Sequence, residues 1–87
     1  MPYEILLEKG AERDFKKLPK NIQKRVLNQI LKLKENPRPI GVRKITDSKN
    51  DWRIRIGDYR VVYEIDDKKK IIKIFRIRHR KEVYLSL

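Results

Sequence analysis

The sequence predicts an α+β fold in which one strand and two helices precede a series of three or four antiparallel strands. Two features of the sequence support this order. Apolar residues recur at helical spacing between positions 11 and 33, and they alternate with polar residues between positions 52 and 65. Because 87 residues suffice for one modest hydrophobic core, we expect residues 1–87 to form a single small domain.

The first half of the chain is predicted to form a short strand and a helical hairpin. Tyr3 to Leu7 is short and rich in apolar residues, which is typical of a strand. The first helix ends at Pro19, and its apolar residues are Ala11, Phe15 and Leu18. We expect Asn21 to cap the second helix and Asn36–Pro37 to end it. The apolar stripe of this helix consists of Ile22, Val26, Ile30 and Leu33, with Leu27 and Leu31 beside it.

The second half of the chain changes to the period of two that is typical of strands. The apolar series consists of Trp52, Ile54, Ile56, Tyr59, Val61, Tyr63 and Ile65. Gly57–Asp58 and Asp66–Asp67 are typical of hairpin connections, so these two strands and Ile71 to Ile77 should form a meander. Val42 to Ile45 is expected to add a strand, followed by an exposed loop from Thr46 to Asp51. The helices must then cover one face of this sheet.

Composition restricts the possible functions. Lys and Arg number 24 against 12 Asp and Glu, and the net charge of +12 predicts a polyanion or an acidic protein as partner. The absence of cysteine excludes disulfide scaffolds, zinc–thiolate sites and thiol catalysis, and it suits a reducing compartment. No apolar run is long enough to cross a membrane, and no signal-peptide pattern is present. We therefore expect a cytoplasmic protein that does not enter a membrane.

Six arginines in the second half are the main candidates for a binding surface. Alternation sends three of them to the sheet face opposite the helices, namely Arg53, Arg55 and Arg60. Three more lie at the end of the last strand and just beyond it, namely Arg76, Arg78 and Arg80. The last strand has apolar residues on both faces, so its pattern leaves the direction of its arginines open. One interpretation is that these arginines are solvated charges that only protect an exposed sheet face from aggregation. The other is phosphate binding, which the planar guanidinium of arginine favours.

Two further side chains near the C-terminus have alternative interpretations. Tyr84 can stack on a nucleic-acid base or anchor the tail of the chain. His79 is the only histidine, and a lone histidine among basic residues is more often a solvated neighbour than a catalyst. No second histidine, cysteine or carboxylate cluster accompanies it, so we expect neither a metal site nor a cofactor.

Two segments, Gly57–Tyr63 (GDYRVVY) and Arg78–Tyr84 (RHRKEVY), are specific in combination. With the order of elements, they make nearly the whole chain resemble the RelE toxins of the RelE/ParE superfamily, which belong to type II toxin–antitoxin modules. The resemblance implies a curved antiparallel sheet with a helical hairpin against it. It also implies an endoribonuclease that cleaves messenger RNA in the ribosomal A site and thereby stops translation.

The resemblance also implies which residues form the site. Arg60, Arg78 and Tyr84 match functional positions of the family, whereas Arg53 and Arg55 match positions that are lysine in well-known bacterial members. We expect the ribose 2′-hydroxyl to attack its own 3′-phosphate while these arginines stabilise the added negative charge, without a metal.

Arginine stays charged in proteins and cannot serve as the base. The acid and base are therefore expected to be His79, Lys81 or groups of the ribosome. Arg76, Arg80 and Lys81 are expected to bind RNA or the ribosome.

The implied partners are a cognate acidic RelB-like antitoxin, the ribosome and messenger RNA. Toxin and antitoxin are expected to form a heterodimer or a heterotetramer. Two other functions stay open at this point. One is inhibition of DNA gyrase, as in the ParE branch of the superfamily, and the other is an RNA- or ribosome-binding module without catalysis.

Overall fold

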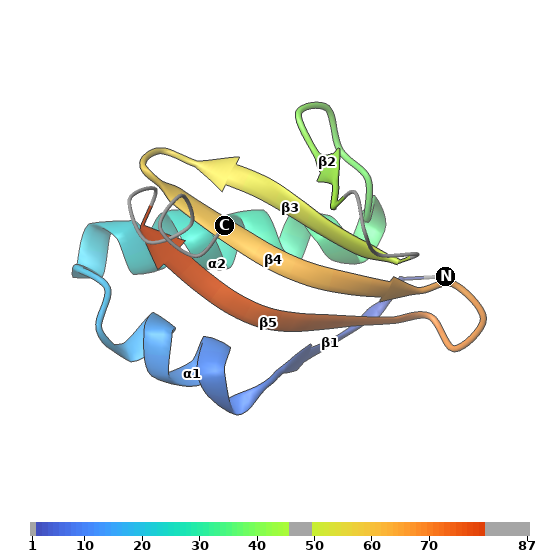
Figure 1. Cartoon of the computed structure of the whole chain (residues 1–87), viewed down its shortest axis with the longest axis horizontal. Helices are drawn as coiled ribbons and strands as arrows, with labels where there is room; N and C mark the ends of the chain where they lie inside the picture. The colour runs from blue at the N-terminus through green and yellow to red at the C-terminus, as the bar shows by residue number, and fades with distance from the viewer. Residues whose placement is uncertain (1, 46–49, 80–87) are drawn as a thin grey trace.

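The computed structural model describes residues 2–45 and 50–79, which form a five-stranded sheet and two helices (Figure 1). The elements in chain order are β1 (Glu4–Leu7), α1 (Lys9–Lys16), α2 (Lys20–Glu35), β2 (Arg43–Lys44), β3 (Asp51–Ile56), β4 (Tyr59–Asp66) and β5 (Ile71–His79). This order and the α+β class confirm the expectation from the sequence. Among the described residues, neither helix is both long and apolar enough to cross a membrane.

The sheet has the strand order β1-β5-β4-β3-β2. Strands β2 to β5 form the antiparallel meander that the alternation predicts, but β1 lies parallel to β5 and makes the sheet mixed. A parallel pair needs a long crossover connection, and here the two helices and the other strands provide it. The apolar pattern of β1 marks a strand without fixing its direction, which is why sequence reasoning did not find the parallel pair.

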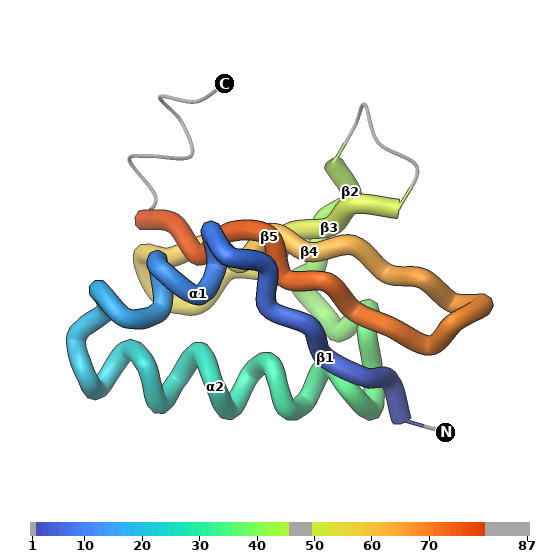
Figure 2. Tube along the Cα trace, turned by 90° about the horizontal axis from the view of Figure 1, so that it is seen from below, coloured from blue at the N-terminus to red at the C-terminus, as the bar shows by residue number. Residues whose placement is uncertain are grey.

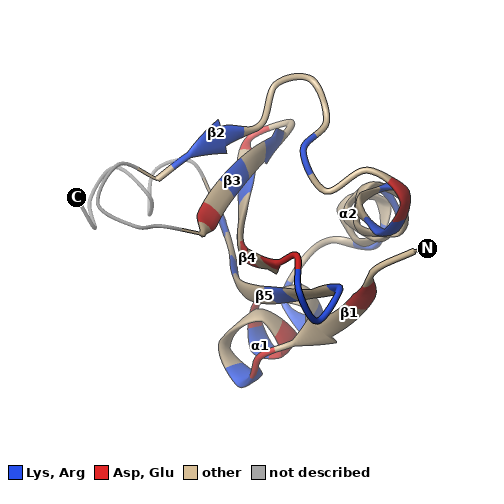
Figure 3. Cartoon of the chain, turned by 90° about the vertical axis from the view of Figure 1, so that its right-hand side faces the viewer, with Lys and Arg blue, Asp and Glu red and all other residues tan. Residues whose placement is uncertain are grey.

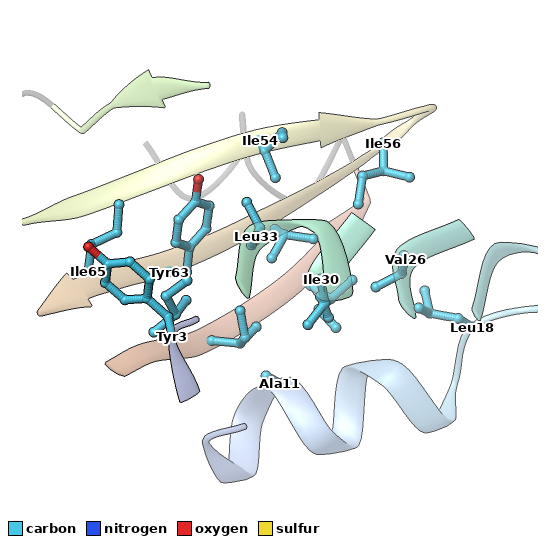
Figure 4. Close-up of a cluster of buried hydrophobic side chains, with 14 residues drawn as sticks. Tyr3, Ala11, Leu18, Val26, Ile30, Leu33, Ile54, Ile56, Tyr63 and Ile65 are labelled. Atoms are coloured by element: carbon cyan, nitrogen blue, oxygen red, sulfur yellow. The ribbon is translucent and has the colours of Figure 1, made fainter. Parts of the chain in front are cut away.

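The hydrophobic core lies between α2 and one face of the sheet (Figures 2 and 4). From α2 it buries Val26, Ile30 and Leu33, while Ala11 of α1 is also fully buried. The sheet contributes Ile54, Ile56, Val61, Tyr63, Ile65, Ile72, Ile74 and Ile77. The predicted stripe of α2 is therefore confirmed, although Leu27 and Leu31 beside it are 48% and 51% exposed.

The start of α2 differs from the expected cap. Pro19, not Asn21, is the N-cap residue, and its carbonyl accepts a hydrogen bond from the N–H of Gln23 at 2.9 Å. The side chain of Gln23 donates to the carbonyl of Phe15 at 3.0 Å and so joins α2 to the end of α1. Proline has a fixed φ and no N–H to satisfy, so it can begin the helix directly after the turn.

A polar cluster around the turn between β4 and β5 joins three segments that are distant in the sequence. Asp67 accepts a hydrogen bond from the Tyr3 hydroxyl at 2.6 Å and two from the Arg38 guanidinium, at 2.8 and 3.3 Å. The Arg38 guanidinium also lies 5.1 Å from the ring centroid of Trp52, which is half-buried. These contacts hold the start of β1, the loop after α2 and the β4–β5 turn in one place.

A candidate nucleic-acid interface

A β-bulge in β5 decides which face its arginines occupy. Tyr63 pairs with Ile74 and Val62 pairs with Arg76, so β5 has one residue more than β4 in this interval, Phe75. The extra residue reverses the alternation of the strand. Ile72 and Ile74 are buried before the bulge, and Ile77 is buried after it. The side chains of Arg76 and Arg78 therefore leave the strand on the face opposite the core. The apolar pattern of the sequence had left this direction open.

Three arginines form one row across adjacent strands. Arg55 of β3 pairs with Arg60 of β4, and Arg60 pairs with Arg78 of β5. Directly paired residues project to the same face, and neighbouring strands lie about 5 Å apart. We call these three residues the arginine row. Arg55 is exposed, and Arg60 and Arg78 are half-buried.

The basic surface extends from the row toward β2. Arg53 lies two positions before Arg55 on β3 and faces the same side, and it pairs with Arg43 of β2. Figure 3 shows β2, with Lys and Arg in blue, beside β3. Sequence reasoning missed Arg43 because β2 has only two residues, which is too short for an alternation signal. The arginine face thus consists of Arg43, Arg53 and the arginine row.

Backbone carbonyls orient two arginines of the row without neutralising them. Arg55 Nε donates to the Gly57 carbonyl at 3.0 Å, and Arg60 Nη1 donates to the Tyr59 carbonyl at 3.2 Å. Gly57 has a φ of +61°, a conformation that glycine adopts at no steric cost in a two-residue hairpin turn. Within residues 2–45 and 50–79, no carboxylate lies within salt-bridge distance of Arg53, Arg55 or Arg60. These three charges therefore remain available to an anionic ligand.

Arg76 is engaged differently from the residues of the row. Its Nε donates to Asp14 Oδ2 at 2.9 Å and its Nη2 donates to Asp14 Oδ1 at 3.1 Å, which makes a two-pronged ion pair with α1. Burial disfavours the charged form of Asp14, but the hydrogen bonds from Arg76 and Ile77 and the charges of Arg76 and Arg78 outweigh it and lower its pKa. The guanidinium that the sequence suggests for RNA binding is thus bound to a carboxylate of α1, while the Arg76 side chain remains 43% exposed.

His79 lies on the opposite side of the sheet from the arginine row. It pairs with Tyr59, and the two rings meet edge to face with centroids 5.3 Å apart. Tyr59 packs against the core, so the His79 ring shares the helix-covered face. The structure therefore does not bring His79 together with the row. Arg80, Lys81 and Tyr84 lie outside the described residues.

The row suits electrostatic stabilisation of a phosphate more than proton transfer. Guanidiniums remain charged at all physiological pH values, and fixed donors stabilise charge that develops on phosphate oxygens. Among residues 2–45 and 50–79, no three His, Asp or Glu side chains gather in a group that could hold a metal ion.

Comparison with known proteins places this fold in a family. A family model described as "ParE toxin of type II toxin-antitoxin system, parDE" matches residues 5–84. The toxin RelG of Mycobacterium tuberculosis is 32% identical over 97% of this chain and 98% of its own length. The toxin RelE of the same organism is 33% identical over 95% of this chain and 87% of its own. The chain belongs to the RelE family of toxins.

A solved structure agrees with this assignment. The RelE–RelB complex of the archaeon Pyrococcus horikoshii OT3 contains a chain that superposes on this one with a TM-score of 0.82. The two chains are 32% identical, and the match covers 92% of this chain and 97% of the other. The RelE fold of this protein thus includes the strands that carry the arginine row.

Proposed function

We propose that this RelE-family toxin is a ribosome-dependent endoribonuclease that cleaves messenger RNA in the A site and stops translation. The observation that carries the proposal is the arginine row, in which Arg55, Arg60 and Arg78 are paired across three adjacent strands. Like charges placed so closely repel each other. A phosphate group that accepts hydrogen bonds from several guanidiniums relieves this repulsion.

The proposed reaction uses a nucleophile that the substrate already contains. The ribose 2′-oxygen attacks the adjacent phosphorus, and the bond from phosphorus to the 5′-oxygen breaks. The products are a 2′,3′-cyclic phosphate and a new 5′-hydroxyl end. The proton of the 2′-hydroxyl leaves to a base, and the 5′-oxygen takes up a proton. Catalysis then rests on alignment of the 2′-oxygen and on stabilisation of the pentacoordinate phosphate.

Each site residue has a distinct role in this proposal. Arg55, Arg60 and Arg78 contact the scissile phosphate, and Arg53 binds phosphate beside them. Tyr84 stacks on the base next to the cleaved bond. The orientation of His79 toward Tyr59 speaks against it as the base, which leaves Lys81 or a group of the ribosome. Arg80 and Lys81 assist binding to RNA or the ribosome.

The test is cleavage of messenger RNA on programmed ribosomes, with mapping of the new 5′ ends. The wild-type protein should produce 5′-hydroxyl ends within the A-site codon, and Arg60→Ala should lose this activity. Arg13→Ala is the matched control, because Arg13 is an exposed arginine of α1 and the variant removes the same charge. Equal cleavage by the wild type and Arg60→Ala would exclude the proposed site.

The match to the ParE toxin model favours inhibition of DNA gyrase as a second candidate function. A supercoiling assay with purified gyrase separates the two activities, because a gyrase poison leaves messenger RNA intact. A third outcome, ribosome binding without new RNA ends, would indicate a non-catalytic binding module.

The proposed partner is a cognate acidic RelB-like antitoxin. The Pyrococcus relative was solved as a RelE–RelB complex, and the net charge of +12 on this chain favours a negatively charged partner. Toxin and antitoxin assemble as a heterodimer or a heterotetramer in which the toxin is neutralised, and the toxin acts in the cytoplasm, where the ribosomes are. Co-purification with the product of the adjacent gene tests this proposal, and two proteins that separate at moderate salt would contradict it.

A further inference from the structure

The end of β5 that carries Arg78 is supported by a helix and not by a strand. β1 pairs with β5 only from Ile71 to Ile74, and a hydrogen bond from the Glu8 N–H to the Ile74 carbonyl at 2.9 Å closes this ladder. From Phe75 onward, α1 lies beside the edge of β5 (Figure 1). The support of this edge therefore depends on side chains of α1.

Asp14 takes the place of the missing strand partner. Its Oδ2 accepts a hydrogen bond from the backbone N–H of Ile77 at 2.9 Å, in addition to the two hydrogen bonds from Arg76. Its side chain is only 15% exposed. One carboxylate thus holds the two residues that directly follow the bulged Phe75 and directly precede Arg78.

Gly10 lets α1 come this close to the bulge. It lies four residues before Asp14, so both residues face the same side of the helix. A Cβ atom at position 10 would lie 3.0 Å from Arg76 Cδ and 3.2 Å from the Phe75 carbonyl oxygen. Two positions of α1 are therefore adapted to the same short segment of β5.

We propose that Asp14 is a positioning residue for the site, because it fixes the bulge that places Arg78 in the arginine row. This inference rests on the proposed nuclease function. The bulge determines the direction of Arg78, since a shift of one residue moves a strand's side chains to the other face. Bulges often occur beside active sites, where they redirect a side chain. Asp14 acts through Arg76 and Ile77 and does not touch the substrate.

The first test compares Asp14→Asn with Glu12→Gln, which removes the same charge from the exposed side of α1. Amide hydrogen exchange of Ile77 should become at least about tenfold faster in Asp14→Asn, while exchange of the core residue Ile72 stays within about twofold of the wild type. The single-turnover cleavage rate should fall about 10²-fold with ribosome affinity unchanged, as for a misplaced catalytic group. Glu12→Gln should match the wild type in all three measurements.

A double variant shows whether Asp14 acts through Arg78. Adding Asp14→Asn to Arg78→Ala should cause no further loss of cleavage, because the group that it positions is already absent. Gly10→Ala provides a second way to disturb the bulge, and it should slow cleavage even though alanine favours the helix. This variant keeps the test valid if Asp14→Asn does not fold.

Three results would overturn the proposal: unchanged Ile77 exchange in Asp14→Asn, full cleavage by Asp14→Asn, or fully additive losses in the double variant. If the wild-type protein cleaves no RNA, the nuclease function fails, but the exchange measurement still reports on the bulge. Unchanged Ile77 exchange would then overturn the structural role of Asp14 as well.

Discussion

Tyr59 and His79 face each other across β4 and β5, and their rings meet edge to face on the helix-covered side of the sheet. Arg60 and Arg78, one position away on the same two strands, pair on the opposite side. The ring contact of Tyr59 with His79 and the paired arginines are therefore only one residue apart along each strand, but they lie on opposite faces of the sheet. The only histidine of the sequence thus lies on the other face of the sheet from the arginines.

This separation predicts that His79 takes no part in proton transfer. His79→Gln keeps a similar size and removes the imidazole ring. Because that ring lies on the other face of the sheet from the arginine row, the cleavage rate of this variant should stay within about twofold of the wild type from pH 6 to pH 8. Single-turnover cleavage across this range provides the measurement. A loss that follows the fraction of neutral histidine would make His79 the base after all.

The arginine row predicts a graded response to substitution at Arg60. Arg60→Lys keeps the charge and loses the planar pair of donors, so cleavage should fall only about tenfold. Arg60→Ala should reduce the rate by about 10²–10³, as expected for removal of one donor to the transition state. Single-turnover rates at saturating ribosomes separate this effect from binding. A lysine variant that cleaves as fast as the wild type would show that the geometry of the guanidinium is unimportant, whereas equal rates for the lysine and alanine variants would show that the charge alone contributes nothing.

Arg53 is expected to act mainly in binding. In Arg53→Ala, affinity for ribosomes or RNA should decrease, and the slope of log affinity against log salt should decrease by about one. Titrations at several salt concentrations measure both quantities. Arg13→Ala controls for the overall change in charge, and an equal change in slope there would show that Arg53 has no special place.

The hydroxyl of Tyr63 should contribute to stability. It donates to the carbonyl of Pro37 at 2.8 Å in the buried core, and burial raises the pKa of this phenol well above its usual value. Tyr63→Phe leaves that carbonyl without its donor and should cost about 1–2 kcal/mol in the free energy of unfolding. Tyr59→Phe is the control, because no hydrogen bond of the Tyr59 hydroxyl occurs among the described residues. Urea unfolding of both variants gives the comparison.

The lowered pKa of Asp14 predicts how its contribution depends on pH. A carboxyl whose pKa is lower in the folded state stabilises the fold above its unfolded pKa of about 3.8, and this stabilisation disappears as the pH falls through the folded value. Asp14→Asn should therefore be less stable than the wild type at pH 7 by about 1–3 kcal/mol. The difference should shrink below about pH 4. A difference that is constant from pH 7 to pH 2 would contradict the ionic origin.

The sequence was sufficient for the parts of the fold that follow a regular period. The stripe of α2 and the alternation in β3 and β4 predict both the core and the outward direction of Arg53, Arg55 and Arg60. Reasoning failed where the period is interrupted. In the sequence, the bulge at Phe75 makes the last strand look apolar on both faces, so the pattern could not assign Arg78 to a face. The ion pair of Arg76 with Asp14 joins residues that are 62 positions apart, and no local pattern connects them.

The parallel pairing of β1 has a consequence for the synthesis of this chain. Glu4–Leu7 is translated long before its partner Ile71–Ile74. This edge of the sheet therefore cannot close until β5 has been translated, and contacts between residues so far apart in the sequence form slowly. Arg78 is translated later still. A nascent chain consequently cannot assemble the three paired arginines before Arg78 has been added.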